Sequence, residues 1–193
     1  MLARQLAQRA APRYIEGAML HRLTLIDPRL PAALLALASA GVLGAAFVFQ
    51  YGFGYQPCIL CLYQRVPYAA VLGFGLITLG FPRWRGLGDA LLVASGLALL
   101  ANAGIATYHV GVEHHWWAGT SACGAAGGAA LTLEDLRAQV MKAPVVRCDE
   151  IQWELFGITM AGYNVVVSLA LSAFAFLAAR VAYRGAGRSE VAA

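Results

Sequence analysis

Charged side chains are scarce in this 193-residue chain. They make up only 12% of its residues, against roughly 25% in soluble domains, while 60% of its residues are hydrophobic. This shortage excludes an ordinary water-soluble domain and indicates an integral membrane protein. The formal net charge of +4 does not predict a nucleic-acid partner, because most basic residues flank apolar runs, where they act as determinants of membrane topology.

Charge is missing altogether from Leu30 to Phe49, and about 20 apolar residues are what a helix needs to cross about 30 Å of hydrocarbon. Glycines, tyrosines and Pro57 then interrupt the run. Three further apolar runs follow, at about 58–81, 87–108 and 158–179. The sequence therefore predicts an all-α integral membrane protein, a four-transmembrane-helix bundle whose membrane domain is 30–179.

The basic residues predict the orientation of these spans. Ten of the fourteen Lys and Arg lie in the segments 1–29, 82–85 and 180–193, whereas 109–157 has three, opposed by six acids. By the positive-inside rule, both termini are cytoplasmic and the loop 109–157 faces the outer side. All four cysteines then face that side, which in a bacterium is the periplasm, where disulfides persist.

The sequence also predicts where the segments outside the spans lie. Residues 1–29 form a basic cytoplasmic lead-in, in which Met19 is an alternative start, and 180–193 form a cytoplasmic tail. Within the outer loop, Thr132 and the acids after it precede apolar residues at helical spacing. We expect a short amphipathic helix at 132–141, lying on the membrane surface.

The four cysteines begin with a C-x-x-C pair, Cys58 and Cys61, at the head of the second span. This spacing is typical of thiol redox centres, and of metal sites when a second ligand pair lies nearby. At a helix start, free N–H groups and the dipole favour Cys61 as a thiolate and leaving group. Two inert membrane cysteines, or a structural disulfide, are the alternatives.

A metal centre is poorly supported. Cys123 and Cys148 are isolated from each other, so the second close pair of a structural zinc site is missing, and without C-x-x-C-H there is no covalent haem motif. Histidines such as His109 stand near tryptophans at a predicted interface, where they are common without a metal. We predict no metal site.

Arg65 lies four residues after Cys61, on the same helix face and one turn deeper in the second span. Its side chain could extend to the lipid headgroups. Alternatively, its charge stabilises a thiolate or a reduced, anionic cofactor, because an ionisable residue within a span is commonly functional.

Cys123 and Cys148 belong to the outer loop, and both are expected to be exposed to the outer compartment. The glycines after Cys123 indicate that it can move, as an exchanging disulfide requires. A purely structural disulfide here would close a loop of about 25 residues. Four cysteines allow three pairings, and the sequence alone does not choose among them.

Together these residues resemble the bacterial disulfide bond formation protein B (DsbB) family of inner-membrane quinone reductases. The similarity covers about Leu30 to Ala179. It rests on the four spans, the loop cysteine pair and three motifs, Phe49-Gln50, Pro57-Cys58-x-x-Cys61-x-Tyr63-x-Arg65 and Gln152-Trp153-x-x-Phe156-Gly157-x-x-Met160. Gln64 departs from the pattern, since some members carry an acid there, and 1–29 has no counterpart.

The resemblance implies a multi-pass protein of the bacterial inner membrane and a relay of electrons. A reduced thioredoxin-fold partner (DsbA-like) attacks a Cys123–Cys148 disulfide, with Cys123 the site of the mixed disulfide. The electrons then pass to Cys58–Cys61, and Cys61 delivers them to ubiquinone or menaquinone from the membrane lipid and quinone pool. The residues implied in quinone binding are Arg65, His109 and Gln50.

Two other classes remain open. A vitamin K epoxide reductase-like enzyme also combines a loop cysteine pair, a C-x-x-C and a quinone, but there the loop pair precedes the C-x-x-C, whereas here it follows. A non-catalytic membrane protein with structural disulfides is the second alternative. Transport is not supported, because apart from Arg65 no relay of charged residues runs through the predicted spans.

Overall fold

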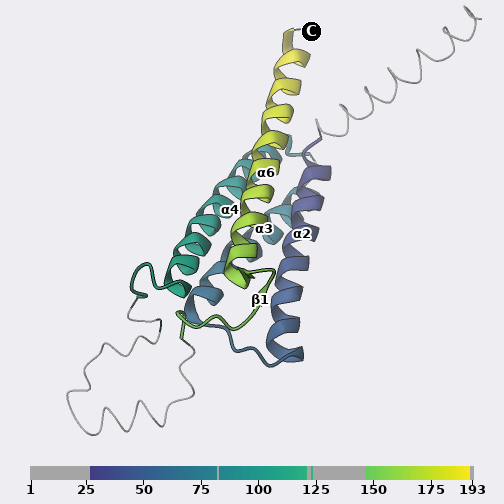
Figure 1. Ribbon diagram of the computed structural model, residues 1–193. Coiled ribbons are helices and arrows are strands. Elements are labelled where there is room, and N and C mark those ends of the chain that lie inside the picture. Colours follow the sequence, from purple (N-terminus) through teal and green to yellow (C-terminus); the bar gives the residue numbers. More distant parts are fainter. Residues whose placement is uncertain (1–26, 82, 121–122, 124–146, 192–193) are drawn as a thin grey trace, which may run out of the picture.

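Four long helices make up most of the protein, seen in a computed structural model that describes residues 27–81, 83–120, 123 and 147–191 (Figure 1). They are α2 (Arg29–Phe47), which continues into the π-helical segment η1 (Val48–Gly52), α3 (Ile59–Gly80), α4 (Arg85–Glu113) and α6 (Met160–Val191). All four are long and apolar enough to cross a membrane, which confirms the predicted four-helix membrane bundle.

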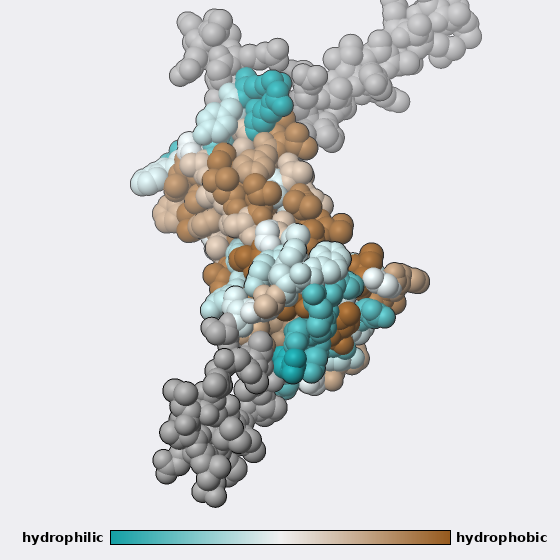
Figure 2. Space-filling view, turned by 60° about the vertical axis from the view of Figure 1, so that its left-hand side comes forward, coloured by the Kyte–Doolittle hydropathy of each residue, from teal (hydrophilic) through white to brown (hydrophobic). Residues whose placement is uncertain are grey.

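The outside of the bundle is apolar. Leu37, Val66 and Leu177 are each more than 60% exposed, as expected of side chains that face lipid rather than water. Figure 2 shows hydrophobic side chains gathered around the middle of the bundle, with hydrophilic ones nearer its ends. Buried polar residues such as Ser39 and Asn102 lie inside instead, where neighbouring helices supply hydrogen bonds.

Small residues bring the helices close together. A Cβ placed on Gly75 of α3 would lie 2.7 Å from the Cβ of Ala36 and 2.8 Å from the carbonyl oxygen of Ala32, both on α2. α3 also packs against α4, and α4 against α6. The core between them includes Leu35, Tyr68, Val71, Leu99 and Ala175.

The third helix is longer than predicted. We expected it to end at Tyr108 and the outer loop to begin at His109, but α4 continues to Glu113. His109 in this last part of α4 meets partners from α3, since its ring nitrogens lie near Gln64 and the Cys58 sulfur. The chain turns beyond it, where His115 adopts a left-handed conformation (φ 58°), and Trp117 folds back onto Gly111.

The start of the fourth helix was also predicted too early. Residues 158–159 belong to a small antiparallel hairpin, in which β1 (Glu154–Leu155) pairs with β2 (Ile158–Thr159). Phe156 and Gly157 form its turn, with φ of 54° and 76°. α6 begins only at Met160 and runs past the predicted end at Ala179.

The hairpin, the start of α3 and the end of α4 lie at one end of the bundle, while α2 starts and α6 ends at the other (Figure 1). This arrangement gathers the cysteine-bearing segments at a single end. The basic lead-in up to residue 26 and the expected amphipathic helix at 132–141 lie outside the described residues.

Candidate functional site

The C-x-x-C pair forms the first turn of α3. Cys58 is the N-cap residue, with extended backbone (φ −72°, ψ 171°), and its Sγ accepts a hydrogen bond from the backbone N–H of Cys61 at 3.3 Å. The two sulfur atoms lie 2.8 Å apart. Helix capping thus places the sulfurs within reach of each other, so a disulfide between them requires only a small movement.

The loop cysteines lie directly against this pair. The backbone N–H of Cys148 donates to the carbonyl oxygen of Cys123 at 3.3 Å, and their thiols contact each other. Both pack in one buried cluster with Cys58, Leu60 and Val112. All four cysteines therefore meet at one end of the bundle.

The expectation that the loop cysteines are exposed was wrong. Cys123 is 2% exposed and Cys148 1%. The reason is tertiary: both cysteines pack against Cys58 and Leu60 at the head of α3 and against Val112 at the end of α4, and these side chains cover them. A protein partner can reach Cys123 only if this cover moves.

Two of these thiols hold their protons tightly. The hydrogen bond to Cys61 and then burial raise the pKa of Cys58 to about 12, against a smaller opposing contribution from His109. Burial, followed by the hydrogen bond to Cys123, raises the pKa of Cys148 well above its usual range. At neutral pH both are thiols in the reduced state, so each must lose its proton before its sulfur can act as a nucleophile.

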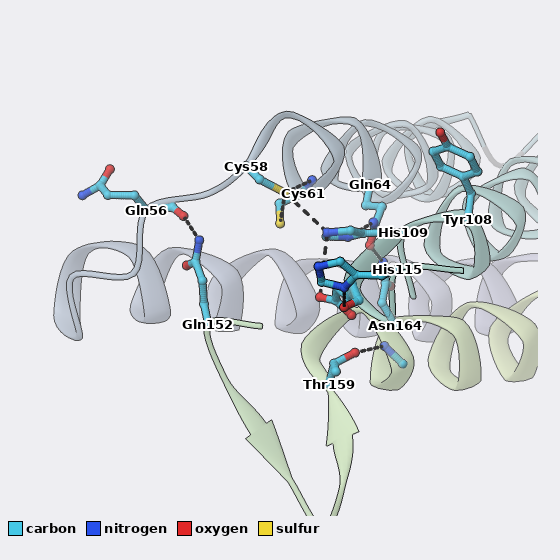
Figure 3. A network of polar contacts seen from close by, with 12 residues as sticks. Gln56, Cys58, Cys61, Gln64, Tyr108, His109, His115, Gln152, Thr159 and Asn164 are labelled. Carbon is cyan, nitrogen blue, oxygen red and sulfur yellow. Dashed lines mark hydrogen bonds and ion pairs between the residues drawn. The ribbon is translucent and has the colours of Figure 1, made fainter. Parts of the chain in front are cut away.

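His109 links the cysteines to a buried polar network (Figure 3). Its Nε2 lies 3.6 Å from the Cys58 sulfur, and its Nδ1 lies 2.9 Å from Nε2 of Gln64. Asn164 on α6 donates to Oε1 of Gln64 at 2.5 Å. Three helices thus hold one imidazole beside the Cys58 sulfur.

The sequence alone did not single out Asn164, and it marked Gln64 only as a departure from a family pattern. A sequence signal existed for Gln64, because it is a polar residue within an apolar run. The structure buries it, at 6% exposure. The network continues inward through Tyr68, Asn102 and Ser168, which share hydrogen bonds with Asn164 or with each other. Its members rigidify the contact of α3, α4 and α6.

Glu113 is a second buried polar group beside His109. Its Oε1 lies 3.8 Å from the imidazole Nε2, and the residue is 7% exposed. Its Oε2 has no hydrogen-bond partner within the described part of the chain. The last turn of α4, which was predicted to be loop, therefore carries two groups of the site.

A cavity of about 370 Å³ opens beside Cys61. Its walls are mainly apolar, and they include all three residues implied in quinone binding, Gln50, Arg65 and His109. Arg65 donates to Oε1 of Gln50 at 2.6 Å and lies 5.2 Å from the centroid of the Phe47 ring. The structure thus places Arg65 on the cavity beside Cys61, held by η1.

Cys58, Cys61 and His109 also bring three potential metal ligands within 4.8 Å of one another. Two thiolates and an imidazole suit a thiophilic metal. However, Gln64 faces Nδ1 with its amide N–H₂, so the ring hydrogen is on Nε2, the nitrogen nearest the sulfurs. The predicted lack of a metal stays a prediction, to which we return below.

The geometry defines a class, a helical membrane protein with two adjoining cysteine pairs beside an apolar cavity. The chain belongs to the DsbB family: the family model for disulfide bond formation protein DsbB matches residues 28–178. Membership implies disulfide oxidoreductase activity, and it disfavours the vitamin K epoxide reductase-like and non-catalytic alternatives.

Curated relatives agree. A disulfide bond formation protein B from Haemophilus influenzae is 33% identical over 141 residues, which cover 69% of this chain and 76% of the relative. The proteins of the same name from Xanthomonas oryzae and a Psychrobacter species are 31% and 29% identical, over 74% and 72% of this chain and 84% and 83% of their own lengths. No solved structure matches significantly.

Proposed function

We propose that the protein oxidises a reduced periplasmic thioredoxin-fold (DsbA-like) dithiol and passes the electrons to a membrane quinone. The observation that carries this proposal is the position of the C-x-x-C pair. On one side it packs in a single cluster with Cys123 and Cys148, and on the other it lines the cavity with Arg65. Electrons can therefore enter from the loop pair and leave toward the cavity without a large movement.

The first exchange takes place at the loop disulfide. A thiolate of the partner attacks the Cys123 sulfur, a mixed disulfide forms, the Cys123–Cys148 bond breaks, and Cys148 leaves with the electron pair. The second partner thiol then displaces Cys123, which leaves the partner oxidised and both loop thiols reduced. Because Cys123 is buried, docking of the partner must first open the cover over it.

The second exchange connects the two pairs. The Cys148 sulfur attacks Cys58, the Cys58–Cys61 bond breaks, and Cys61 leaves as a thiolate at the first turn of α3, where the helix dipole stabilises it. Attack of Cys123 on Cys148 then restores the loop disulfide and releases Cys58. The contacts of Cys148 with both Cys123 and the head of α3 support this order.

The cavity suits a quinone by its chemistry. Its apolar walls fit a prenylated ring, while Arg65, Gln50 and His109 offer hydrogen-bond donors for ring carbonyl oxygens. A bound quinone supplies the acceptor for two electrons and two protons. Arg65 stabilises negative charge beside Cys61, and the Cys58–Cys61 disulfide re-forms as the pair gives up its electrons.

The placement in the cell belongs to the same proposal. The cysteines face the periplasm from the inner membrane, and the lead-in 1–29 and tail 180–193 are cytoplasmic. Its support is the distribution of basic residues, together with the gathering of the cysteine-bearing segments at one end of the bundle (Figure 1). Residues 30–179 then form the redox domain.

A coupled assay tests the function. Purified protein in a bilayer or detergent, given a reduced thioredoxin-fold dithiol and a quinone, should oxidise the dithiol with stoichiometric loss of quinone absorbance. Cys61→Ser should abolish turnover, whereas Leu37→Ala, which changes an exposed side chain of α2, should not. Unchanged turnover in Cys61→Ser would reject the relay.

A further inference from the structure

The hydrogen-bond network determines which nitrogen of His109 carries a hydrogen. A neutral imidazole has one N–H, and the partner of one nitrogen decides the state of the other. His109 is buried at 4% exposure, so water does not compete freely for either position. The partners on the surrounding helices therefore select the tautomer.

The side chains that lead to Nδ1 form a chain of hydrogen bonds in which each residue donates to the next. The Tyr68 hydroxyl donates to Oδ1 of Asn164 at 2.6 Å, and Nδ2 of Asn164 donates to Oε1 of Gln64. The amide of Gln64 is thereby oriented, with its Nε2 facing Nδ1 of His109 at 2.9 Å. An amide nitrogen only donates, so Nδ1 accepts and the ring hydrogen belongs to Nε2.

The surroundings of Nε2 match this assignment. The Cys58 sulfur lies 3.6 Å away and Oε1 of Glu113 lies 3.8 Å away. A sulfur and a carboxylate can each accept a hydrogen bond. The hydrogen on Nε2 thus points into a group of acceptors, while Nδ1 meets a donor.

We propose that Gln64 and Asn164 are positioning residues that hold His109 in its Nε2–H tautomer, so that His109 is a hydrogen-bond donor to the Cys58 sulfur and not a base. Its consequence for the reaction rests on the proposed function. When Cys123 attacks the Cys148 sulfur, the Cys148–Cys58 bond breaks and Cys58 leaves with the electron pair as a thiolate. The Nε2–H stabilises that thiolate, and a stabilised thiolate leaves faster.

The same tautomer disfavours a metal at Cys58, Cys61 and His109. An imidazole nitrogen binds a metal through its lone pair, usually while its other nitrogen donates to a second-shell acceptor. Here Nδ1 accepts and Nε2 is protonated, the reverse arrangement. A metal could bind only if the amides of Gln64 and Asn164 both turned over, which would remove the bond from Tyr68 to Oδ1 of Asn164.

Nitrogen NMR of the full chain tests the tautomer without reference to turnover. The protein is labelled with ¹⁵N-histidine and reduced, and His109 is identified among the four histidines by its loss in His109→Gln. We expect a protonated Nε2 and an unprotonated Nδ1. In Gln64→Glu, a carboxylate accepts in place of the amide donor, so Nδ1 should become protonated. A protonated Nδ1 in the unaltered protein would overturn the proposal.

Kinetics test the consequence. Gln64→Met keeps the length of the side chain but loses the donor, and Asn164→Leu leaves Gln64 free to turn. Both should show mixed tautomers and a kcat lowered by about 10-fold to 100-fold, the value of one hydrogen bond to a charged group. Gln64 and Asn164 also line the cavity, so kcat is measured at saturating quinone, where a change in quinone affinity does not lower it. Mixed tautomers with unaltered kcat would refute the donor role of His109 and leave the proposed function intact. Absence of turnover in the unaltered protein would instead refute the proposed function.

Discussion

The guanidinium of Arg65 on α3 donates to the side-chain oxygen of Gln50 in η1 at 2.6 Å, across the wall of the cavity that Cys61 lines. The bond joins two residues that stand 15 positions apart and on different helices. It fixes a cation one turn beneath the C-x-x-C pair. This geometry favours a role at the cavity over an arginine that merely extends to the lipid headgroups.

Removal of this cation should weaken quinone binding. We expect Arg65→Ala to raise the KM for quinone by about 10-fold or more, because a hydrogen bond to a charged group contributes about 1.5–3 kcal/mol. Arg65→Lys keeps the charge but not the shape of the donor group, so its KM for quinone should lie between those of the unaltered protein and Arg65→Ala. The measurement is the quinone dependence of dithiol oxidation, and normal kinetics in Arg65→Ala would return the residue to the headgroup interpretation.

The two loop cysteines should differ in trapping experiments. With Cys148→Ser, Cys123 is a lone thiol that can attack the disulfide of an oxidised partner, and no Cys148 thiol is present to displace the partner from Cys123, so a mixed disulfide should accumulate and be visible on a non-reducing gel. With Cys123→Ser, no such species should form. The opposite pattern would assign the partner to Cys148.

The pKa of Cys58 predicts its reactivity. In the reduced protein with Cys123→Ser and Cys148→Ser, alkylation of Cys58 should be slow at pH 8, because its pKa is raised to about 12 and thiolate forms only as the pH approaches that value. The largest cause is the hydrogen bond to Cys61, so adding Cys61→Ala should lower the pKa and bring the labelling to lower pH.

Labelling of Cys58 is followed by mass spectrometry of its peptide across a pH series. An unshifted profile after Cys61→Ala would show that burial, the second cause, dominates instead. His109→Gln is the matched comparison, because it removes a group that lowers the pKa and should move the profile in the opposite direction.

The close contact of α2 and α3 predicts a sensitive glycine. Gly75→Ala places a Cβ 2.7 Å from that of Ala36 and beside a backbone carbonyl, so the helices must separate, at a cost of about 1–3 kcal/mol. Gly73→Ala is the control, since nothing lies within 4 Å of a Cβ there. Thermal unfolding in detergent should separate the two variants, and equal stability would argue against tight packing at this crossing.

Several features followed from local pattern. A helix must satisfy its own backbone hydrogen bonds in lipid, so long uncharged runs predict four spans whatever their packing. The position of Cys58 at the start of α3 followed from Pro57 and the glycines before it. Helix periodicity placed Arg65 one turn from Cys61, and the cavity that both line agrees with it. The number of residues between two positions of one helix determines whether they share a face, because an α-helix completes a turn every 3.6 residues.

The ends of the helices could not be predicted as well. His109 and Glu113 are polar and stand where a span was expected to have ended, yet they are helical. Gln64 and Cys58 offer His109 buried partners, and His109 in turn lies 3.8 Å from Glu113. The exposure of the loop cysteines was mispredicted for a related reason, because Cys123 and Cys148 pack against residues that are distant in the sequence, Cys58 and Leu60 of α3 among them.

By itself, then, the sequence determined the membrane class, the four spans, the C-x-x-C at a helix start and, through its resemblance, the family. Only the tertiary structure decided that all four cysteines meet, that Gln50 holds Arg65, and that Asn164 reaches His109 through Gln64. The physical reason is the distance along the chain over which each effect acts. Hydrophobicity and helical period act over a few turns of one segment, whereas these contacts join residues up to 100 positions apart and exist only once the helices pack.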